Sequence, residues 1–505
     1  MHTSIRQLRC AALLVAGTLA ASLPAQTPTA PPAPAPEAPV TPYAPKAPAT
    51  ITLKDAFKGH FHMGVAITPN QVNGQNPKAA ELILREFDCI SPENVMKMGP
   101  IHPRPGNDDS SYNFADADTY VDFGVKNHLF VIGHNLCWHS QMPGWMSQPD
   151  AGQATLTKEV LMQRLHDHIM KVAGRYKGRV NGWDVVNEAL ADNAGQQGDM
   201  PNGLRSGSPF NRIVGGPEYI LMAFKWAHEA DPAAELYYND YNLDASDFKR
   251  ANCIELIKYL QTNGAAITGV GMQGHYNMNG PAIAKIDETI GMFEALGIKV
   301  HVTELDVRAT GANAALTGAV AGGPPAAGQN AARGPGQPGA RGGRGGGRGG
   351  LPAPDALKTS LSLSDEQVAK ITPLLETHTA NITAAAGDVA KITASRTATI
   401  ASLRPILTPA QQKSFDEQFM PQAGGGAPVG ARPTPLTAQE QQNLSKRYGE
   451  IFQVFLKHKS VVRVTFWGLH DGVSWRRADS PLVFDDTSSR KPAYDGVIGA
   501  LTAKP

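Results

Sequence analysis

Two glutamates stand at the ends of apolar runs that are typical of buried β-strands. Glu188 follows the run WDVVN, and Glu304 ends the run KVHVTE. Two carboxyl groups that flank a glycosidic bond can cleave it, because one protonates the leaving oxygen while the other attacks the sugar carbon. The apolar run before Glu188 predicts partial desolvation, which raises a carboxyl pKa toward the range of a general acid/base. We therefore expect Glu188 to be the acid/base and Glu304 the nucleophile.

Two polar neighbours support the role expected for Glu304. Asp306 lies two residues further along the same strand, and alternation along a strand puts it on the same side. His275 ends the preceding expected strand. We expect these three side chains to form a hydrogen-bonded cluster that keeps Glu304 ionised. A single glutamate at a strand end is more often a salt-bridge partner or a helix cap. The interpretation of Glu304 as a nucleophile therefore depends on the neighbouring residues Asp306 and His275.

Polar side chains recur at the carboxyl ends of seven expected strands, and together they predict a site for carbohydrate. Tryptophan offers a flat apolar face to a sugar ring, while amide, imidazole and ammonium groups bind its hydroxyls. No Ser/His/Asp arrangement and no metal-ligand spacing stands out. The strand ends read SPENVMK, GHNLCWH, VVNEA, NDYN, MQGH, TELD and FWGLHDGVSW.

The elements that must position these residues alternate between short apolar runs and longer amphipathic stretches. This alternation is typical of βα units and a parallel sheet. The expected strands begin at His62, Phe87, Leu129, Val180, Glu235, Ile267, Lys299 and Val461. Eight strands and a closing helix near Tyr494 predict an α/β protein with a (β/α)8 TIM barrel, built from residues 51–308 and 441–505. The absence of a GxGxxG turn after the first strand disfavours a dinucleotide-binding fold.

The motifs SPENVMK, GHNLCWHSQMPGW, WDVVNEA, YYNDYN, GVGMQGHY, VHVTELDV and TFWGLHDGVSW occur in this order. The chain thereby resembles glycoside hydrolase family 10, the retaining endo-β-1,4-xylanases, over both barrel segments. The resemblance implies hydrolysis of the xylan backbone with net retention, and carboxyl groups roughly 5 to 5.5 Å apart. The nearest enzymatic alternative is a barrel β-1,4-glucanase (cellulase) that uses the same two carboxylates. A non-catalytic carbohydrate-binding protein is a weaker alternative, since both carboxylates are present.

The resemblance also assigns sugar-binding roles, position by position. Asn187 would bond the 2-hydroxyl of the sugar undergoing cleavage, and His134 and Lys97 its other hydroxyls. Glu93 and Asn94 would hold the next sugar, and Tyr241 would lie on the leaving-group side. The remaining implied residues are Trp138 beneath the sugar, Gln273 and His275 near the nucleophile, and Trp467 and Trp475 above the sugar.

The amino-terminal region predicts export. Two arginines precede a short apolar run in MHTSIRQLRCAALLVAGTLAASLPAQ, which is typical of a signal peptide (1–25) and too short to span a bilayer. A Pro-rich linker (26–50) follows, and residues 24–48 hold 10 of the 39 prolines. We expect a protein secreted to the periplasm or the exterior. Its remaining cysteines, Cys89, Cys137 and Cys253, permit at most one disulfide and are typical of buried apolar positions.

An insertion separates the seventh strand from the eighth. Residues 309–360 are expected to be a disordered Gly/Arg-rich linker, because residues 311–350 contain 15 of the 51 glycines. Helix-start signals at Ser364 and Thr408 predict a small helical insert (361–420), followed by a linker (421–440). A third signal, Thr437 with Glu440, should begin the barrel's own seventh helix. The insert is either a loosely packed spacer or an overhang that tunes access to the leaving-group subsites.

The composition of the chain disfavours two classes of binding partner, nucleic acids and membranes. The net charge is only +1 and charged residues make up 18% of the chain, so no whole-molecule field favours nucleic acid or anionic lipid. The arginines of the Gly-rich tract lack interleaved aromatics for base stacking, which disfavours an RNA-binding role. We expect a monomer that binds xylan and xylo-oligosaccharides, with no nucleic-acid or membrane partner, no cofactor and no metal.

Overall fold

The computed structural model describes residues 51–150, 152–197, 203–309, 351, 354–361, 363–384, 389–408, 411–412 and 435–502. The leader, the Pro-rich linker and the Gly/Arg-rich tract lie outside these ranges, so the expectations for them stay predictions. The unit Met1–Ala44 lies wholly in the part that is not described. Within the described ranges, no helix combines the length and hydropathy needed to cross a membrane.

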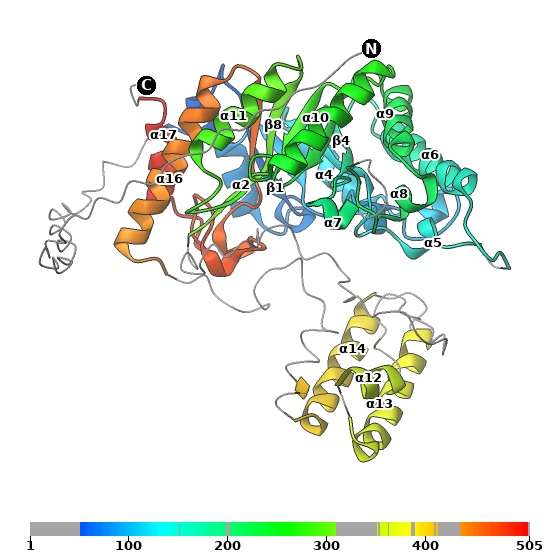
Figure 1. Cartoon of the computed structure of the whole chain (residues 1–505). Coiled ribbons are helices and arrows are strands. Elements are labelled where there is room, and N and C mark those ends of the chain that lie inside the picture. Colours follow the sequence, from blue (N-terminus) through cyan, green and yellow to red (C-terminus); the bar gives the residue numbers. More distant parts are fainter. Residues whose placement is uncertain are drawn as a thin grey trace, which may run out of the picture. The chain divides into compact units, whose positions relative to one another are not determined.

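A closed parallel β-barrel forms the centre of the fold, with helices around it (Figure 1). The strands are β1 (His62–Ile67), β2 (Cys89–Pro92), β3 (Phe130–Trp138), β4 (Gly182–Asn187), β5 (Glu235–Asp240), β6 (Gly269–Met272), β7 (His275–Asn277), β8 (Lys299–Arg308) and β9 (Val461–Phe466). Each pairs in parallel with its neighbours in the order β1 to β6, then β8 and β9, and β9 closes the barrel on β1. The predicted (β/α)8 barrel is confirmed.

Helices separate the strands along the chain. The principal ones are α2 (Pro77–Glu86), α4 (Ala115–Lys126), α6 (Lys158–Arg175), α9 (Glu218–Ala230), α10 (Asp247–Thr262), α11 (Ile283–Glu294), α16 (Ala438–Lys457) and α17 (Pro492–Gly499). Shorter helices lie in the connections: α1 (Leu53–Ala56), α3 (Met98–Ile101), α5 (Gly144–Ser147), α7 (Ala194–Gln197) and α8 (Pro209–Val214). In Figure 1, α16 packs beside α11 and α17, although a long insertion precedes it in the chain.

The sixth position of the barrel is divided between two strands, of which the sequence predicted only the first, as the run ITGVGMQ from Ile267. The left-handed φ of 79° at Gly274 breaks the strand between β6 and β7, and both pieces pair with β8. Glycine is suited to this position because it lacks the Cβ that disfavours positive φ. The break redirects the chain at Gln273 and His275, two of the residues expected in the site.

The insertion contains three described helices with a core of their own. These are α12 (Pro354–Leu361), α13 (Asp365–Ala384) and α14 (Val389–Leu403). Leu357, Leu361, Ile371, Leu375 and Leu403 are all buried in this core. Helix α12 occupies the end of the range that was expected to be a disordered linker (309–360), and this part of that prediction is wrong. The glycine density that motivated it stops before Leu351, and the following residues supply apolar side chains at helical spacing.

Two capping boxes in the insertion bond to one another. The Gln367 side chain accepts from the Ser364 N–H (3.0 Å), and the Gln411 side chain accepts from the Thr408 N–H (3.0 Å). Gln367 Nε2 also donates to Gln411 Oε1 (2.8 Å) and to the Ile406 carbonyl (2.9 Å). The third box, Thr437 with Glu440, begins α16 as predicted. The helix starts of the insertion are therefore joined through side chains as well as through its apolar core.

We predict that Gln367→Ala loosens the insertion without affecting the barrel. The substitution removes the side-chain acceptor of the Ser364 N–H and the bond to Gln411, while Ser364 Oγ still accepts from the N–H of residue 367. Each lost hydrogen bond costs about 1 kcal/mol. Hydrogen exchange on the full chain should show faster exchange in α13 and unchanged exchange in α6. Gln439→Ala is the matched control, because Gln439 is exposed and, among the described residues, its side chain bonds Asn443 alone. Unchanged protection of α13 would show that the paired boxes do not stabilise it.

Candidate active site

The two expected catalytic glutamates lie at the same end of the barrel. Glu188 directly follows β4, and Glu304 lies within β8, with β5 and β6 between them in the sheet. Each side chain is nearly buried, at 5% relative exposure. The carboxyl ends of parallel barrel strands are where barrel enzymes carry out their chemistry. The fold therefore brings the pair together as the sequence predicted.

A chain of side-chain amides connects the two carboxylates. Asn239 Nδ2 donates to Glu304 Oε1 and to Asn187 Oδ1, each at 2.9 Å. Gln273 Nε2 donates to Glu188 Oε1 at 2.8 Å and to Asn187 Oδ1 at 3.4 Å. Each –NH2 group thus uses both of its protons, one toward a carboxylate and one toward the shared Asn187 oxygen. The network bonds one carboxylate oxygen of each glutamate and so restricts the orientation of both.

The cluster expected around Glu304 is present. His275 Nε2 lies 3.1 Å from Glu304 Oε2, and His275 Nδ1 lies 3.0 Å from Asp306 Oδ2. Asp306 also accepts from Arg476 Nη1 (2.7 Å) and from Trp475 Nε1 (2.8 Å). His275 is therefore held between two carboxylates, and Asp306 in turn is held by a guanidinium and an indole.

This cluster keeps Glu304 ionised. Burial raises the pKa of Glu304, but the hydrogen bond from His275 and the charges of His134 and Lys97 outweigh burial and hold the pKa below its usual value. Burial opposes a charged His275, yet Asp306 and Glu304 raise its pKa. An ionised carboxylate aimed into the site is the form required of a nucleophile.

Trp138 and Lys97 lie on the Glu188 side of the site. The Trp138 indole Nε1 donates to Glu188 Oε2 at 3.0 Å, and the Lys97 ammonium lies 5.1 Å from the centre of the Trp138 ring. Lys97 Nζ also donates to Asn94 Oδ1 (3.0 Å). Burial lowers the pKa of Lys97, and burial raises the pKa of Glu93. The residues expected to hold sugar hydroxyls thus form one connected group.

His134 and Trp467 form the adjoining wall. His134 Nδ1 lies 2.9 Å from Asp184 Oδ2, and both side chains are buried. The rings of His134 and Trp467 meet edge to face, with centroids 5.4 Å apart. The bond to Asp184 fixes the orientation of the imidazole, so that its Nε2 edge is presented consistently.

Tyr241 is less available to a ligand than its expected role implies. The residue is 5% exposed, and its hydroxyl bonds Asp192 (2.9 Å) and Arg205. The Lys249 ammonium lies 3.4 Å from the ring centre. Its hydroxyl is engaged within the protein, so the expected contact with the leaving group stays a prediction.

Some residues that bond the expected site residues were not singled out from the sequence. Asn239 and Asp184 lie on strands whose motifs were quoted, and strand alternation could have placed Asn239 inside the barrel. Arg205 and Arg476 lie in long connections with no periodic pattern, and nothing in the sequence indicated them. Among the described residues, no group of three His, Cys, Asp or Glu side chains could hold a metal ion.

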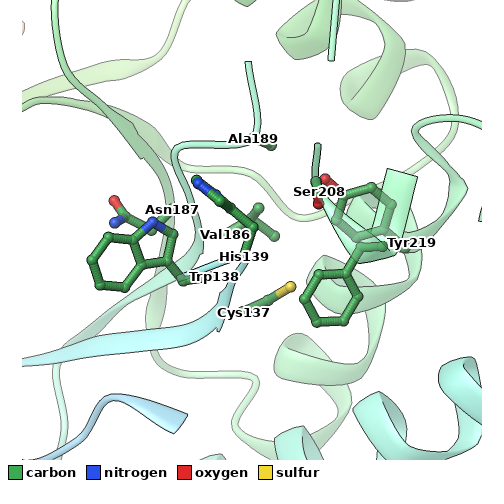
Figure 2. A pocket seen from close by; sticks show the side chains of 9 residues that line it. Cys137, Trp138, His139, Val186, Asn187, Ala189, Ser208 and Tyr219 are labelled. Atoms are coloured by element: carbon green, nitrogen blue, oxygen red, sulfur yellow. The ribbon is translucent and has the colours of Figure 1, made fainter. Parts of the chain in front are cut away.

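A small pocket adjoins Trp138 and Asn187. Its lining residues are Cys137, Trp138, His139, Val186, Asn187, Ala189, Ser208, Phe210 and Tyr219. Figure 2 shows the Trp138 and Asn187 side chains together on one side of the pocket, with Ser208 and Tyr219 on the other. Cys89, Cys137 and Cys253 are free and buried, as expected of small apolar residues. Among the described residues, His139 Nδ1 has no hydrogen-bond partner although it is buried.

Comparison with known proteins identifies one family. The family model described as Glycosyl hydrolase family 10 matches residues 52–330 and 429–500. A beta-1,4-xylanase of Dictyoglomus thermophilum is 42% identical over 257 residues, which are 51% of this chain and 66% of that protein. Matches to two further curated xylanases span 36% and 65% of their lengths. The chain thus covers less than two thirds of these relatives.

Solved structures agree with the fold. A GH10 endoxylanase retrieved from a sugarcane soil metagenome is 28% identical, with a TM-score of 0.59, over 89% of this chain and 99% of that chain. An intracellular xylanase from Thermoanaerobacterium saccharolyticum, determined as a mutant in complex with xylotriose, is 25% identical with a TM-score of 0.58 over 89% of this chain and 99% of that chain.

We predict that His139 makes the protein less stable in mild acid. Burial and the charge of Arg205 lower the pKa of His139 to about 4, whereas the unfolded chain titrates near ~6.5. Below that value the unfolded state binds a proton that the folded state does not, so stability falls with pH. From pH 7 to pH 5.5 the free energy of unfolding of the wild type should fall about 1 kcal/mol further than that of His139→Gln.

Urea unfolding at the two pH values measures this difference. His60→Gln, at an exposed histidine, is the control and should follow the wild type. Equal losses for His139→Gln and the wild type would contradict the prediction.

Proposed function

Because this chain belongs to glycosyl hydrolase family 10, we propose that it is a retaining endo-β-1,4-xylanase that cleaves internal bonds of xylan. The observation that carries the proposal is the pairing of two buried glutamates through the Asn239, Asn187 and Gln273 amides. Two carboxyl groups held in one amide network can act on the same glycosidic bond, as the double displacement of a retaining enzyme requires.

In the first step, Glu304 attacks the anomeric carbon from one face of the sugar. Glu188 donates its proton to the glycosidic oxygen as the C–O bond breaks, and the sugar becomes an ester of Glu304. In the second step, Glu188 takes a proton from a water molecule, and that water displaces Glu304. The amide network suits both steps, because it fixes Glu304 through Asn239 and Glu188 through Gln273 while neither amide has to move.

The surrounding residues are suited to holding a xylose unit between the glutamates. Among the described residues, the Asn187 amide nitrogen makes no hydrogen bond, which leaves it as a donor for the 2-hydroxyl. Lys97 and His134 can serve the remaining hydroxyls, and the indoles of Trp138, Trp467 and Trp475 can enclose the ring. Glu93 and Asn94, which group with Lys97, would hold the next sugar.

We predict that Glu304→Gln lowers xylan hydrolysis at least about a thousandfold, because the amide cannot form the ester intermediate. Glu188→Gln should also lower it, by about a hundredfold or more, through the loss of proton transfer. Reducing-sugar release from xylan measures both. Glu218→Gln is the matched control, since Glu218 is exposed and bonds Lys158 on the outer surface.

The same assay on carboxymethylcellulose tests the β-1,4-glucanase alternative. The proposal requires release from xylan to exceed release from the cellulose derivative. Activity on the cellulose derivative alone, or full activity of Glu304→Gln, would overturn it.

We predict net retention at the anomeric carbon, because two displacements restore its configuration. Proton NMR of fresh digests of borohydride-reduced xylo-oligosaccharides, which have no reducing end of their own, should show the β-anomer first and the α-anomer only after mutarotation. Initial α-anomer would indicate an inverting mechanism and would contradict the role of Glu304 as nucleophile.

A further inference from the structure

The residue proposed as acid/base has an unusual backbone conformation. Glu188 has a φ of 55°, in the left-handed region that residues with a Cβ seldom occupy. Such a conformation is strained for a residue with a Cβ and persists only where the surroundings enforce it. The direction of the Glu188 side chain depends on this turn, so the groups that enforce the turn also aim the carboxyl group.

Four backbone groups of the turn are bonded by three residues. The Glu188 N–H donates to the Asn239 carbonyl (2.9 Å), and the Glu188 carbonyl accepts from Arg205 Nε (3.2 Å). The next two N–H groups, of Ala189 and Leu190, both donate to the Tyr238 hydroxyl oxygen at 3.1 Å. The Tyr238 hydroxyl therefore accepts both of the backbone N–H groups that follow Glu188.

The Tyr238 hydroxyl is held in the orientation that this task requires. It donates its proton to Asp240 Oδ2 at 2.5 Å, which leaves both lone pairs for the two N–H groups. Asp240 Oδ1 in turn accepts from Lys249 Nζ (2.7 Å) and from the Tyr241 N–H (2.9 Å). Tyr238, Asp240 and Lys249 are fully buried, so water does not compete for these bonds.

We propose that Tyr238 is a positioning residue for proton transfer by Glu188, acting through the hydroxyl that clamps the left-handed turn. This inference rests on the proposed function, in which Glu188 protonates the leaving oxygen. Without the hydroxyl, two buried N–H groups lose their acceptor and the turn has to rearrange to pair them. The carboxyl group would then meet the glycosidic oxygen in a less productive geometry.

The proposal predicts a loss that depends on the leaving group. A sugar leaving group needs a proton, whereas a dinitrophenolate leaves without one. In Tyr238→Phe, kcat/KM on xylohexaose should fall tenfold or more, while kcat/KM on 2,4-dinitrophenyl β-xylobioside should change less than about threefold. A purely structural defect lowers both equally, because it reduces the amount of active enzyme.

Two further variants sharpen the test. Tyr237→Phe is the matched control, because it removes the neighbouring tyrosine hydroxyl, which bonds Glu235 (2.8 Å) at the other end of β5. Both rates should stay at wild-type values in this variant.

Asp240→Asn keeps Tyr238 intact but reverses the hydrogen bond between the two side chains. The amide oxygen must face the donors Lys249 and Tyr241, so the amide nitrogen faces the Tyr238 oxygen and takes one of its lone pairs. This variant should show the same leaving-group dependence, and it keeps the test valid if Tyr238→Phe does not fold.

Crystal structures of the variants provide a measurement that does not depend on substrate. The proposal expects the turn at Glu188 to be displaced in Tyr238→Phe or Asp240→Asn, and unchanged in Tyr237→Phe. An unchanged turn, or equal losses on both substrates, would overturn the proposal. If the wild-type protein fails to hydrolyse xylan, the proposed function fails instead, and the structures alone decide whether the hydroxyl holds the turn.

Discussion

Two carboxyl groups must lie close together in a nearly dry site, and this constraint explains the residues around them. Two carboxylates repel each other strongly at short range when water is excluded. Each carboxyl group therefore needs its own set of hydrogen-bond donors. The Asn187 side-chain oxygen accepts hydrogen bonds from the amides of Asn239 and Gln273. It thereby orients each of these amides toward one of the two glutamates. The barrel supplies these groups from β4, β5 and the break between β6 and β7. No single connection could place them with equal rigidity.

Charge is distributed asymmetrically across this pair. Glu304 faces a histidine that is itself held between carboxylates, with Arg476 behind Asp306. Glu188 instead faces uncharged donors, the Trp138 indole and the Gln273 amide. An environment rich in positive charge favours the ionised form of a carboxyl group, as at Glu304. The neighbours of the two glutamates thus differ in charge, which supports the different roles proposed for them.

Strand-end motifs and local caps were predictable because both depend on residues close together in the chain. Glu188, Glu304 and Asp306 followed from apolar runs, and the boxes at Ser364, Thr408 and Thr437 from residues three positions apart. The positive φ of Gly274 and the short strand after it were not predictable, since Gly274 follows the apolar run and lies between the polar residues Gln273 and His275. The engagement of the Tyr241 hydroxyl was also hidden, because Arg205 and Asp192 come from an irregular connection. Long-range polar contacts leave no periodic trace in a single sequence.

The place of the insertion in the chain has a thermodynamic consequence. About 130 residues separate the end of β8 from the start of α16, yet β9 still pairs with both β8 and β1. The entropy of closing a connection grows only with the logarithm of its length, so extending a loop from about ten residues to this length costs roughly 2 kcal/mol. The ring of strands can tolerate such a cost, because its closing strand forms parallel ladders on both edges. The long connection affects the folding rate more than the stability, since it slows the pairing of β9 with β8 and β1 that closes the barrel.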